Sequence, residues 1–214
     1  MKRNKSTILL LFGAMTLAAT TACNTTTKRL AKQGVERIEH SLDNPETDTN
    51  TEDADIQPNG LELPAPLNGT PEIIQKRKGY TVSYNTVTLL PNWVAWRLTA
   101  AHTKGNCQRK GIDFTEDDEV PTPRATDNDY RRSGYDRGHM CPAGDNKWDV
   151  TAMEQSFLFT NICPQAPQLN RGDWNEMEMA CRKWAQKYGE IYIVCGPVLY
   201  NRKHTTIGHN KVTV

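Results

Sequence analysis

The clearest strand pattern lies in the middle of the chain. Residues 80–84 and 93–98 are rich in Val, Trp and Tyr, and Pro91 and Asn92 separate the two runs. Valine and aromatic residues favour extended backbone, and a proline followed by an asparagine favours a turn. We therefore expect two neighbouring strands of one sheet, joined by a turn.

The clearest helix pattern covers residues 173–188. Asp173 and Glu176 have the spacing of a capping box, which would satisfy free amide groups at the start of the helix. The apolar residues recur at the spacing of one helix face and predict a buried stripe, made of Trp174, Met177, Cys181 and Trp184.

Two further apolar runs predict strands, at residues 156–161 and 191–195, and Gly196 and Pro197 end the second run. Strands that come in pairs, with one long helix between the later ones, favour an α+β fold over a parallel α/β sheet. Residues 102–134 are polar, with scattered glycines and prolines, and predict a long surface loop.

Residues 1–23 have the pattern of an export signal. A basic start is followed by an apolar run at residues 8–19, which is too short for a membrane span of roughly 20 residues. Cys23 then stands where bacterial lipoproteins carry a lipidated cysteine, although Thr20 replaces the usual aliphatic residue. We expect an exported protein that is secreted, periplasmic, or anchored to a bacterial membrane through Cys23.

Residues 24–60 are predicted to be a polar tether. Within them, residues 28–42 have the pattern of a short amphipathic helix, and residues 43–60 hold six acidic side chains and no basic one. A segment of this composition cannot bury enough apolar surface to offset its ordering entropy, so we expect it to be largely disordered. The folded domain is then expected to cover residues 61–214.

Charge and cysteine content restrict the chemistry. The formal net charge is +1, and residues 61–214 hold 19 basic and 17 acidic side chains. Affinity for a polyanion must therefore come from a local cluster. Apart from Cys23, five cysteines remain, so at least one thiol is unpaired within the chain. No two cysteines have the CxxC spacing, which argues against a zinc site built from them.

The densest group of reactive side chains is Tyr-Asp-Arg-Gly-His-Met at residues 135–140. Phosphodiester hydrolysis needs a base that deprotonates water, and the neutral imidazole of His139 suits that role near pH 7. It also needs a cation for the charge that develops on the phosphate, and the guanidinium of Arg137 offers a fork of donors. A polar turn with a hydrogen-bonded histidine is the alternative interpretation.

Two side chains further along support the first interpretation. Asn170 precedes the predicted helix, and an amide oxygen is a hard ligand that suits magnesium. Turn or capping chemistry is the alternative for this asparagine. Glu178 lies at the edge of the apolar stripe, where a carboxylate costs free energy unless a partner satisfies it. That partner is either a hydrated metal ion beside Asn170 or the side chain of Arg182.

Three motifs together resemble a known family. YDRGHM, TNICPQ and LNRGDWNEMEMACRKWA, in this order and with these gaps, resemble the DNA/RNA non-specific endonuclease family, the Serratia-type nucleases of the ββα-metal group. The resemblance runs from about residue 80 to the end of the sequence. It implies a central antiparallel sheet flanked by helices, with a metal-binding strand–helix motif at one side.

The resemblance also implies roles for individual residues. It makes His139 the general base, Asn170 the only protein ligand of magnesium, and Glu178 the residue that holds metal-bound waters. Arg137 and Asn161 match positions that line the site. The expected cofactor is therefore magnesium, with manganese as a substitute.

Three features depart from the family pattern. The family carries another catalytic arginine upstream of the histidine, and Arg109 is the nearest candidate. Cys141 and Cys163 replace small or apolar residues beside the site, and a bridge between them is one interpretation. Family members usually continue past residues 211–214 into one more proline-led apolar segment, so we expect a chain truncated at its C-terminus.

The sequence therefore predicts a metal-dependent endonuclease that cleaves DNA and RNA with little specificity, because phosphate contacts carry no sequence information. Arg131 and Arg132 are candidate phosphate contacts, unless they pair with Asp127 and Asp129 nearby. One alternative is a nucleic-acid-binding lipoprotein that has lost catalysis but keeps Arg137 and the basic cluster Arg124, Arg131 and Arg132. The other is a metal-dependent phosphoesterase that acts on small substrates.

Overall fold

The computed structural model describes residues 9–14, 60–199 and 203–214. The amphipathic helix, nearly all of the tether and most of the export signal that the sequence predicts lie outside these residues, and these features stay predictions. Within the described part of the chain, no helix is long and apolar enough to cross a membrane.

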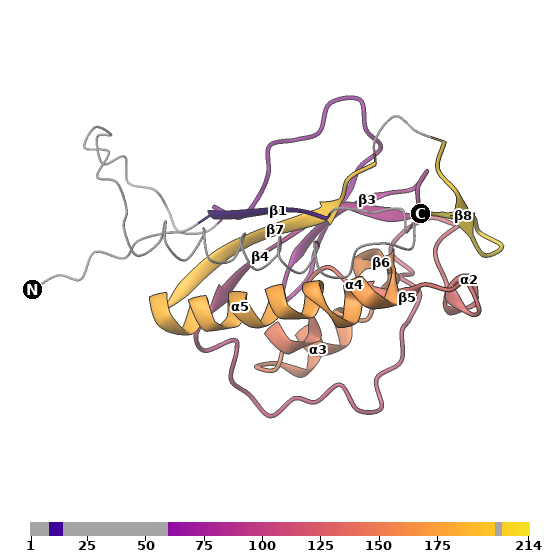
Figure 1. The fold of residues 1–214 in the computed structure, drawn as a ribbon. Helices are drawn as coiled ribbons and strands as arrows, with labels where there is room; N and C mark the ends of the chain where they lie inside the picture. Colours follow the sequence, from indigo (N-terminus) through magenta and orange to yellow (C-terminus); the bar gives the residue numbers. More distant parts are fainter. Residues whose placement is uncertain (1–8, 15–59, 200–202) are drawn as a thin grey trace, which may run out of the picture.

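A five-stranded sheet forms the centre of the fold (Figure 1). Its strands, in spatial order, are β1 (Leu9–Ala14), β7 (Glu190–Pro197), β4 (Leu90–Thr99), β3 (Thr81–Asn85) and β2 (Ile73–Lys76). β1 runs parallel to β7, and the other three pairs are antiparallel. The strand predicted at residues 191–195 is thus confirmed as β7, in a mainly antiparallel sheet.

The predicted strand pair is confirmed as β3 and β4, but the turn between them lies earlier than expected. The side chain of Asn85 accepts hydrogen bonds from the amides of Val87 and Thr88, at 2.9 and 3.2 Å, and closes the turn. Pro91 lies inside β4, opposite Tyr84, beside a shift in register. Proline has no amide to donate, and an irregularity in the ladder accommodates it.

The predicted long helix is confirmed as α5 (Asp173–Tyr188), which lies along the sheet against β7 and β4 (Figure 1). Cys181 and Trp184 of the predicted stripe are buried. The predicted capping box is wrong, because the helix begins after Gly172 and no side chain caps it. A shorter helix, α4 (Pro167–Arg171), ends at this glycine, so the chain passes from one helix directly into the next.

The strand predicted at residues 156–161 is wrong. α3 (Val150–Gln155) occupies the preceding residues and is capped by Asp149, whose carboxylate accepts a hydrogen bond from a first-turn amide at 3.0 Å. The 3-10 helix η2 (Phe159–Asn161) follows, and strand β6 (Ile162–Gln165) begins only after it. Residues 156–161 are mostly buried but do not form a strand. In a short apolar segment, periodicity cannot distinguish a buried strand from a buried turn or helix.

A two-stranded sheet carries the first motif. β5 (Asp136–His139) pairs antiparallel with β6, so that Asp136 lies opposite Gln165 and His139 lies opposite Ile162. β6 then leads into α4 and α5. This succession of two antiparallel strands and a helix is the ββα arrangement that the motifs imply, and with the central sheet it confirms the α+β fold (Figure 1).

Residues 102–134 form a long segment that runs past the helices (Figure 1) and contains only one short helix, α2 (Asp127–Tyr130). The prediction of a loop is confirmed, because the backbone of this segment is irregular. The prediction that the loop lies on the surface is only partly right, because several of its side chains are buried. A short hairpin near the C-terminal end, β8 (Thr206–Ile207) and β9 (Val212–Thr213), packs against it through Asn210. The segment buries Asp117, Val120, Ala125, Asp129 and Tyr130.

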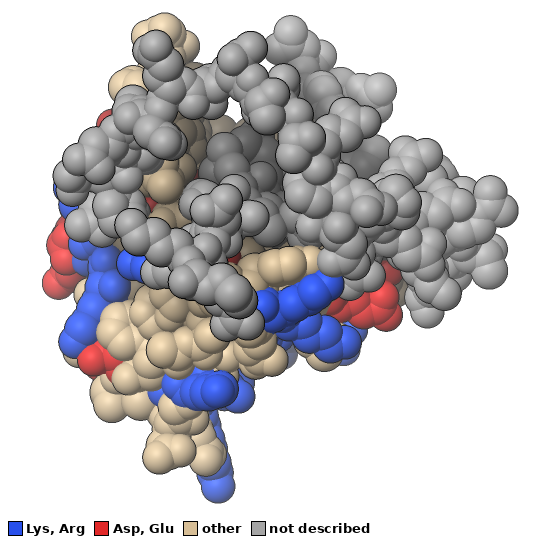
Figure 2. All heavy atoms as spheres, turned by 90° about the vertical axis from the view of Figure 1, so that its left-hand side faces the viewer, with Lys and Arg blue, Asp and Glu red and all other residues tan. Residues whose placement is uncertain are grey.

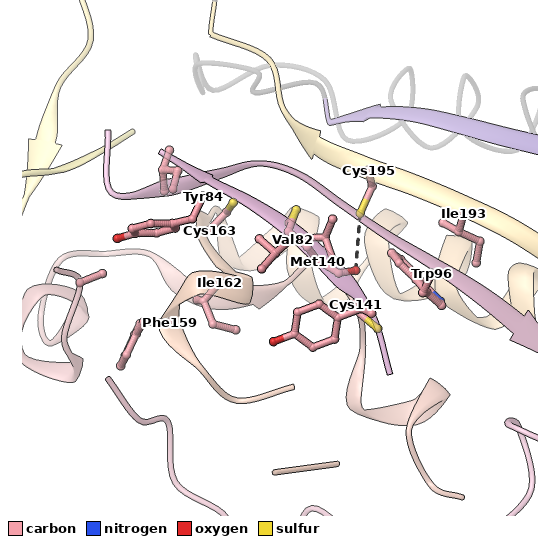
Figure 3. Packing of buried hydrophobic residues seen from close by; sticks show 14 of the residues in the cluster. Val82, Tyr84, Trp96, Met140, Cys141, Phe159, Ile162, Cys163, Ile193 and Cys195 are labelled. Atoms are coloured by element: carbon pink, nitrogen blue, oxygen red, sulfur yellow. Dashed lines mark hydrogen bonds between the residues drawn. The ribbon is translucent and has the colours of Figure 1, made fainter. Parts of the chain in front are cut away.

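The main hydrophobic core joins the sheet, the β5–β6 hairpin and α5 (Figure 3). At its centre the thiol of Cys195 donates to the carbonyl oxygen of Met140 at 3.6 Å (Figure 3). The bridge considered between Cys141 and Cys163 is not formed, because both side chains are free thiols. The core therefore fixes the residue after His139 against β7.

The 3-10 helix η1 (Ala143–Asp145) follows β5 in the chain.

Candidate active site

The β5–β6 hairpin places the first motif within a tightly packed strand pair. Gly138 is buried, and a Cβ atom added there would lie 2.2 Å from the side chain of Gln165 on β6. Only glycine lets these two strands pack in this way. The alternation of side chains along β5 then sends Arg137 and His139 to the same side of the strand, away from the side of Asp136.

His139 is buried between two aromatic rings. Its ring centroid lies 4.9 Å from that of Phe157 and 5.3 Å from that of Phe114. Its Nε2 atom is buried and has no hydrogen-bond partner. Burial, together with a smaller effect of the positive charge of Arg109, lowers the pKa of His139 to about 3. The imidazole is therefore neutral near pH 7, with one nitrogen free to accept a proton.

Arg137 is held between an acid and two rings. One guanidinium nitrogen lies 2.6 Å from Asp127 Oδ1, and the guanidinium carbon lies 5.7 Å from the ring centre of Phe114 and 5.8 Å from that of Tyr130. Its Nε atom is buried without a partner. Arg137 thus keeps an unsatisfied N–H group, which can donate a hydrogen bond to an anion.

Arg109, the upstream arginine considered from the sequence, belongs to the same site. Its guanidinium carbon lies 5.4 Å from the ring centre of Phe157, the ring that also packs against His139. Its positive charge lowers the pKa of both His139 and Glu178. The long irregular segment therefore carries an exposed cation to the edge of the pocket that holds the histidine.

Asn170 lies on α4 and is oriented by Asp136. Its Nδ2 donates to Asp136 Oδ2 at 3.0 Å, and Arg171 makes two hydrogen bonds of 2.8 Å to the same carboxylate. The guanidinium of Arg171 is the main cause that lowers the pKa of Asp136, and the amide of Asn170 also lowers it. With its amino group engaged, the amide of Asn170 has its Oδ1 available to a cation.

Glu178 is mostly buried on α5, as its position at the edge of the stripe suggests. Burial raises the pKa of Glu178 to about 7, against the lowering effect of the Arg182 charge. Arg182 Nη1 lies 3.8 Å from Glu178 Oε2 but only 2.9 Å from Asp145 Oδ1. The alternative partner considered from the sequence is therefore present, but its shorter bond goes elsewhere.

Asn161 does not project into the site. Its side chain is completely buried, accepts a hydrogen bond from the amide of Cys141 at 2.9 Å, and donates to the carbonyl oxygens of Cys141 and Ser156 at 2.8 Å each. The prediction that Asn161 lines the site differs from this geometry. In the structure its side chain fixes the backbone two residues after His139.

Arg131 is connected to Arg137 through Asp127, with which both arginines pair. Arg131 is exposed and pairs with Asp127 at 2.9 Å, so the pairing considered as an alternative is realised for this residue. Asp129 is buried and accepts hydrogen bonds from Thr126 and Asn210, so it serves another part of the fold. Arg132 is also exposed.

Charge is dispersed over the surface seen in Figure 2. The basic side chains visible there stand in separate groups among uncharged and acidic residues, and the described atoms in this view form no continuous basic area. This agrees with the small excess of basic side chains in residues 61–214.

Several residues around the site carry no signal in the sequence. Phe114 and Phe157 wall the histidine, Asp127 holds Arg137, and Asp145 holds Arg182. Each acts through a contact between distant parts of the chain or through a short loop. Neither periodicity nor motif spacing could have found them.

The donor atoms at the site suit a hydrated cation. In the described part of the chain, no group of three or more His, Cys, Asp or Glu side chains could enclose a metal ion. The oriented amide of Asn170 and the partly buried carboxylate of Glu178 offer few but hard ligands instead. Magnesium keeps most of its waters and binds to sites of this kind.

A comparison with family models decides the identification. The model of the DNA/RNA non-specific endonuclease family matches residues 59–214. The chain belongs to this family. The resemblance drawn from the three motifs is thereby confirmed, and with it the family's ββα-metal fold.

Relatives in this nuclease family come from distant organisms. The human protein named "Endonuclease G, mitochondrial" is 35% identical over 151 residues, which are 66% of this chain and 51% of the human one. "Nuclease EXOG, mitochondrial" of Danio rerio is 39% identical over 61% of this chain and 39% of its own. "Mitochondrial nuclease" of Saccharomyces cerevisiae is 34% identical over 74% of this chain and 49% of its own. The chain thus spans about half the length of its relatives or less.

A solved structure of the family shares the fold. The crystal structure titled "Crystal structure of the EndoG/EndoGI complex: Mechanism of EndoG inhibition" matches with a TM-score of 0.64 and 32% identity, covering 66% of this chain and 63% of that one. About two thirds of this chain therefore share the fold of an experimentally determined relative.

Proposed function

We propose that the protein is a metal-dependent endonuclease that hydrolyses phosphodiester bonds of DNA and RNA with little sequence specificity. The observation that carries the proposal is the state of His139. Its imidazole is buried and its Nε2 has no hydrogen-bond partner, so this nitrogen is free to take a proton. Two arginines, Arg109 and Arg137, pack against the same aromatic walls.

His139 begins the reaction by taking a proton from a water molecule at its unpaired Nε2. The resulting hydroxide attacks phosphorus in line with the leaving oxygen, and that oxygen leaves with a proton from solvent. Arg137 and Arg109 stabilise the negative charge that builds up on the phosphate. The dry aromatic walls formed by Phe114 and Phe157 strengthen these electrostatic interactions.

Asn170 and Glu178 would hold the divalent cation, magnesium or manganese. When bound, it supplies charge neutralisation at the reacting phosphate and at the leaving oxygen. Asp136 contributes by fixing the amino group of Asn170. The family comparison supports a nuclease, and the choice between magnesium and manganese belongs to this proposal alone.

Low sequence specificity follows from the residues around the site. The candidate contacts are arginines, which bind phosphate oxygens and leave the base edges unread. The names of the relatives, endonuclease G and nuclease EXOG, agree with an activity on nucleic acids. A digestion of supercoiled plasmid and of RNA, in magnesium and in excess EDTA, tests the proposal. Cleavage of both substrates in magnesium alone supports it, and cleavage of neither substrate in any divalent cation refutes it.

Export is part of the same proposal. The basic start, the apolar run at residues 8–19 and Cys23 support an export signal with a lipidated cysteine. Removal of this signal would take away the edge strand β1 and leave β7 at the edge of the sheet. Fractionation of a bacterial host that expresses the full sequence, followed by mass spectrometry of the mature N-terminus, tests it. Membrane association that Cys23→Ser abolishes supports lipidation. A mature chain that still carries residues 1–23 in the cytoplasm contradicts export.

A further inference from the structure

Glu178 is connected to a buried acid on another element by one shared arginine. Arg182 Nη1 donates to Asp145 Oδ1 at 2.9 Å and lies 3.8 Å from Glu178 Oε2. The side chain of Asp145, on η1, is only 1% exposed. Its second oxygen accepts a hydrogen bond from the indole of Trp96 on β4, at 3.0 Å. The acid is thus held on both sides, and the arginine stands between two carboxylates.

The guanidinium of Arg182 packs directly against the backbone of Gly144. A Cβ atom added to Gly144 would lie 2.8 Å from Arg182 Nη1 and 3.1 Å from Arg182 Cζ. Glycine at this position leaves the room that the guanidinium fills beside Asp145. Trp96, Asp145 and Glu178 also line one small cavity between the sheet and α5. The backbone of η1 and the carboxylate of Asp145 therefore define together where Arg182 stands.

We propose that Asp145 is a positioning residue that keeps Arg182 from closing on Glu178. Arg182 and Glu178 are four residues apart on α5, a spacing at which the two side chains form a direct ion pair readily. Asp145 takes the guanidinium instead, in the shorter bond. Glu178 is then left with an accessible carboxylate, which the proposed function requires for binding the hydrated cation. The inference rests on that function for the role of Glu178 alone.

A static ion pair that only ties η1 to α5 is the competing explanation. The two explanations differ in what happens when both members are changed. If Asp145 acts by restraining Arg182, loss of Asp145 weakens manganese binding only while Arg182 is present to form an ion pair with Glu178. If the pair is only a tie between two elements, removing the second member restores at most the stability of the chain, because no unpaired charge is left, and it does not change the manganese affinity of the folded protein.

The experiment measures binding of manganese to the whole chain without substrate, by electron paramagnetic resonance of the free ion. Asp145→Asn is expected to weaken manganese binding about tenfold, in the range for residues that orient the groups around a metal. The double variant Asp145→Asn with Arg182→Gln is expected to recover most of this loss. In plasmid cleavage, Asp145→Asn should raise the half-saturating magnesium concentration and leave the KM for DNA unchanged.

Two further variants keep the result interpretable. Gly144→Ala should displace the guanidinium while leaving the Asp145 charge in place, and it should weaken manganese binding in the same direction even where Asp145→Asn fails to fold. Asp117→Asn is the matched control, because Asp117 is also a buried acid paired with an arginine, Arg77, at 2.6 Å. It should lower stability and leave manganese affinity as in the parent.

Distinct outcomes overturn the two claims. Unchanged manganese affinity in both Asp145→Asn and Gly144→Ala overturns the positioning role, and so does a double variant that binds manganese as weakly as Asp145→Asn. An equal loss in Asp117→Asn also overturns it, because the effect would then be one of stability. A parent chain that cleaves neither plasmid nor RNA in any divalent cation refutes the proposed function, whatever the variants bind.

Discussion

The amide of Asn170 donates to Asp136 across a sequence separation of 34 residues, at 3.0 Å. This bond fixes which end of the amide faces the acid, and so it leaves Oδ1 as the end available to a cation. Asp136 itself is held by two hydrogen bonds from Arg171. The first residue of β5 and the end of α4 are thereby joined into one unit.

Asp136→Asn is expected to raise the half-saturating magnesium concentration for plasmid cleavage by about ten- to a hundredfold, because the new amide can no longer dictate the orientation of Asn170. Arg171→Ala is the matched control, since it removes the ion pair at the surface and keeps the bond to Asn170. A magnesium titration of plasmid cleavage by both variants measures this shift. A loss in Arg171→Ala as large as in Asp136→Asn would contradict the proposed orientation of Asn170.

The contribution of His139 to the stability of the metal-free protein should fall as the pH drops below 6.5. The pKa of His139 is about 3 in the folded chain, against an ordinary value of 6.5, so the unfolded chain binds the proton first. The contribution of the neutral histidine is therefore complete above pH 6.5 and is lost toward pH 3, by about 1.4 kcal/mol per pH unit inside this window.

The measurement is urea unfolding of the parent and of His139→Asn between pH 7 and pH 4, without metal. The difference in unfolding free energy between the two should shrink as the pH falls. Glu178 and Asp145, whose pKa values are raised, act in the opposite direction, but they act equally in both proteins. A difference that stays constant over this range would show that His139 is not buried in its neutral form.

Asn161→Ala is expected to lower the free energy of unfolding by about 3 kcal/mol, because it removes the partners of buried backbone groups at Cys141 and Ser156. Thermal and urea unfolding measure this loss. Since the side chain does not face the site, activity per folded molecule at low temperature should stay within about tenfold of the parent. A hundredfold loss of activity with unchanged stability would instead make Asn161 a catalytic residue.

Replacing Arg131 and Arg132 by Ala together should flatten the salt dependence of duplex DNA binding by up to about two units, because each neutralised phosphate contributes roughly −0.9 to the slope. Binding is measured in calcium. The pair of Arg131 with Asp127 lies at the surface, where such pairs contribute about 0–1 kcal/mol, so stability should hardly change. An unchanged slope would assign both arginines to the scaffold.

The sequence predicts those parts of the molecule in which one local pattern decides the structure. The apolar period of residues 173–188 fixes α5 because a helix buries one face regardless of what covers it. The runs around Val82 and Trp96 fix β3 and β4 for a similar reason. The sequence predicts a strand at residues 156–161 and is wrong there, because Phe157 and Phe159 are buried in a turn and in η2, and buried turns need apolar side chains as much as strands do.

The site is predictable only as far as its motifs. His139, Asn170 and Glu178 stand out by spacing, but the environment that gives them their properties comes from elsewhere in the chain. The rings that depress the pKa of His139 are contributed by Phe114 and Phe157, from segments that carry no motif. Such contacts between distant segments depend on the complete fold, so the sequence pattern could not reveal them.

The central claim is that His139 is the general base of a metal-dependent nuclease. The most direct measurement is the rate of plasmid and RNA cleavage by the parent and by His139→Ala, in magnesium and in excess EDTA, with manganese binding to both proteins measured in parallel. EDTA is expected to abolish cleavage by the parent. His139→Ala is expected to be at least about a hundredfold slower and to bind manganese as the parent does. Cleavage by His139→Ala at the parental rate, or full activity of the parent in EDTA, would contradict the central claim.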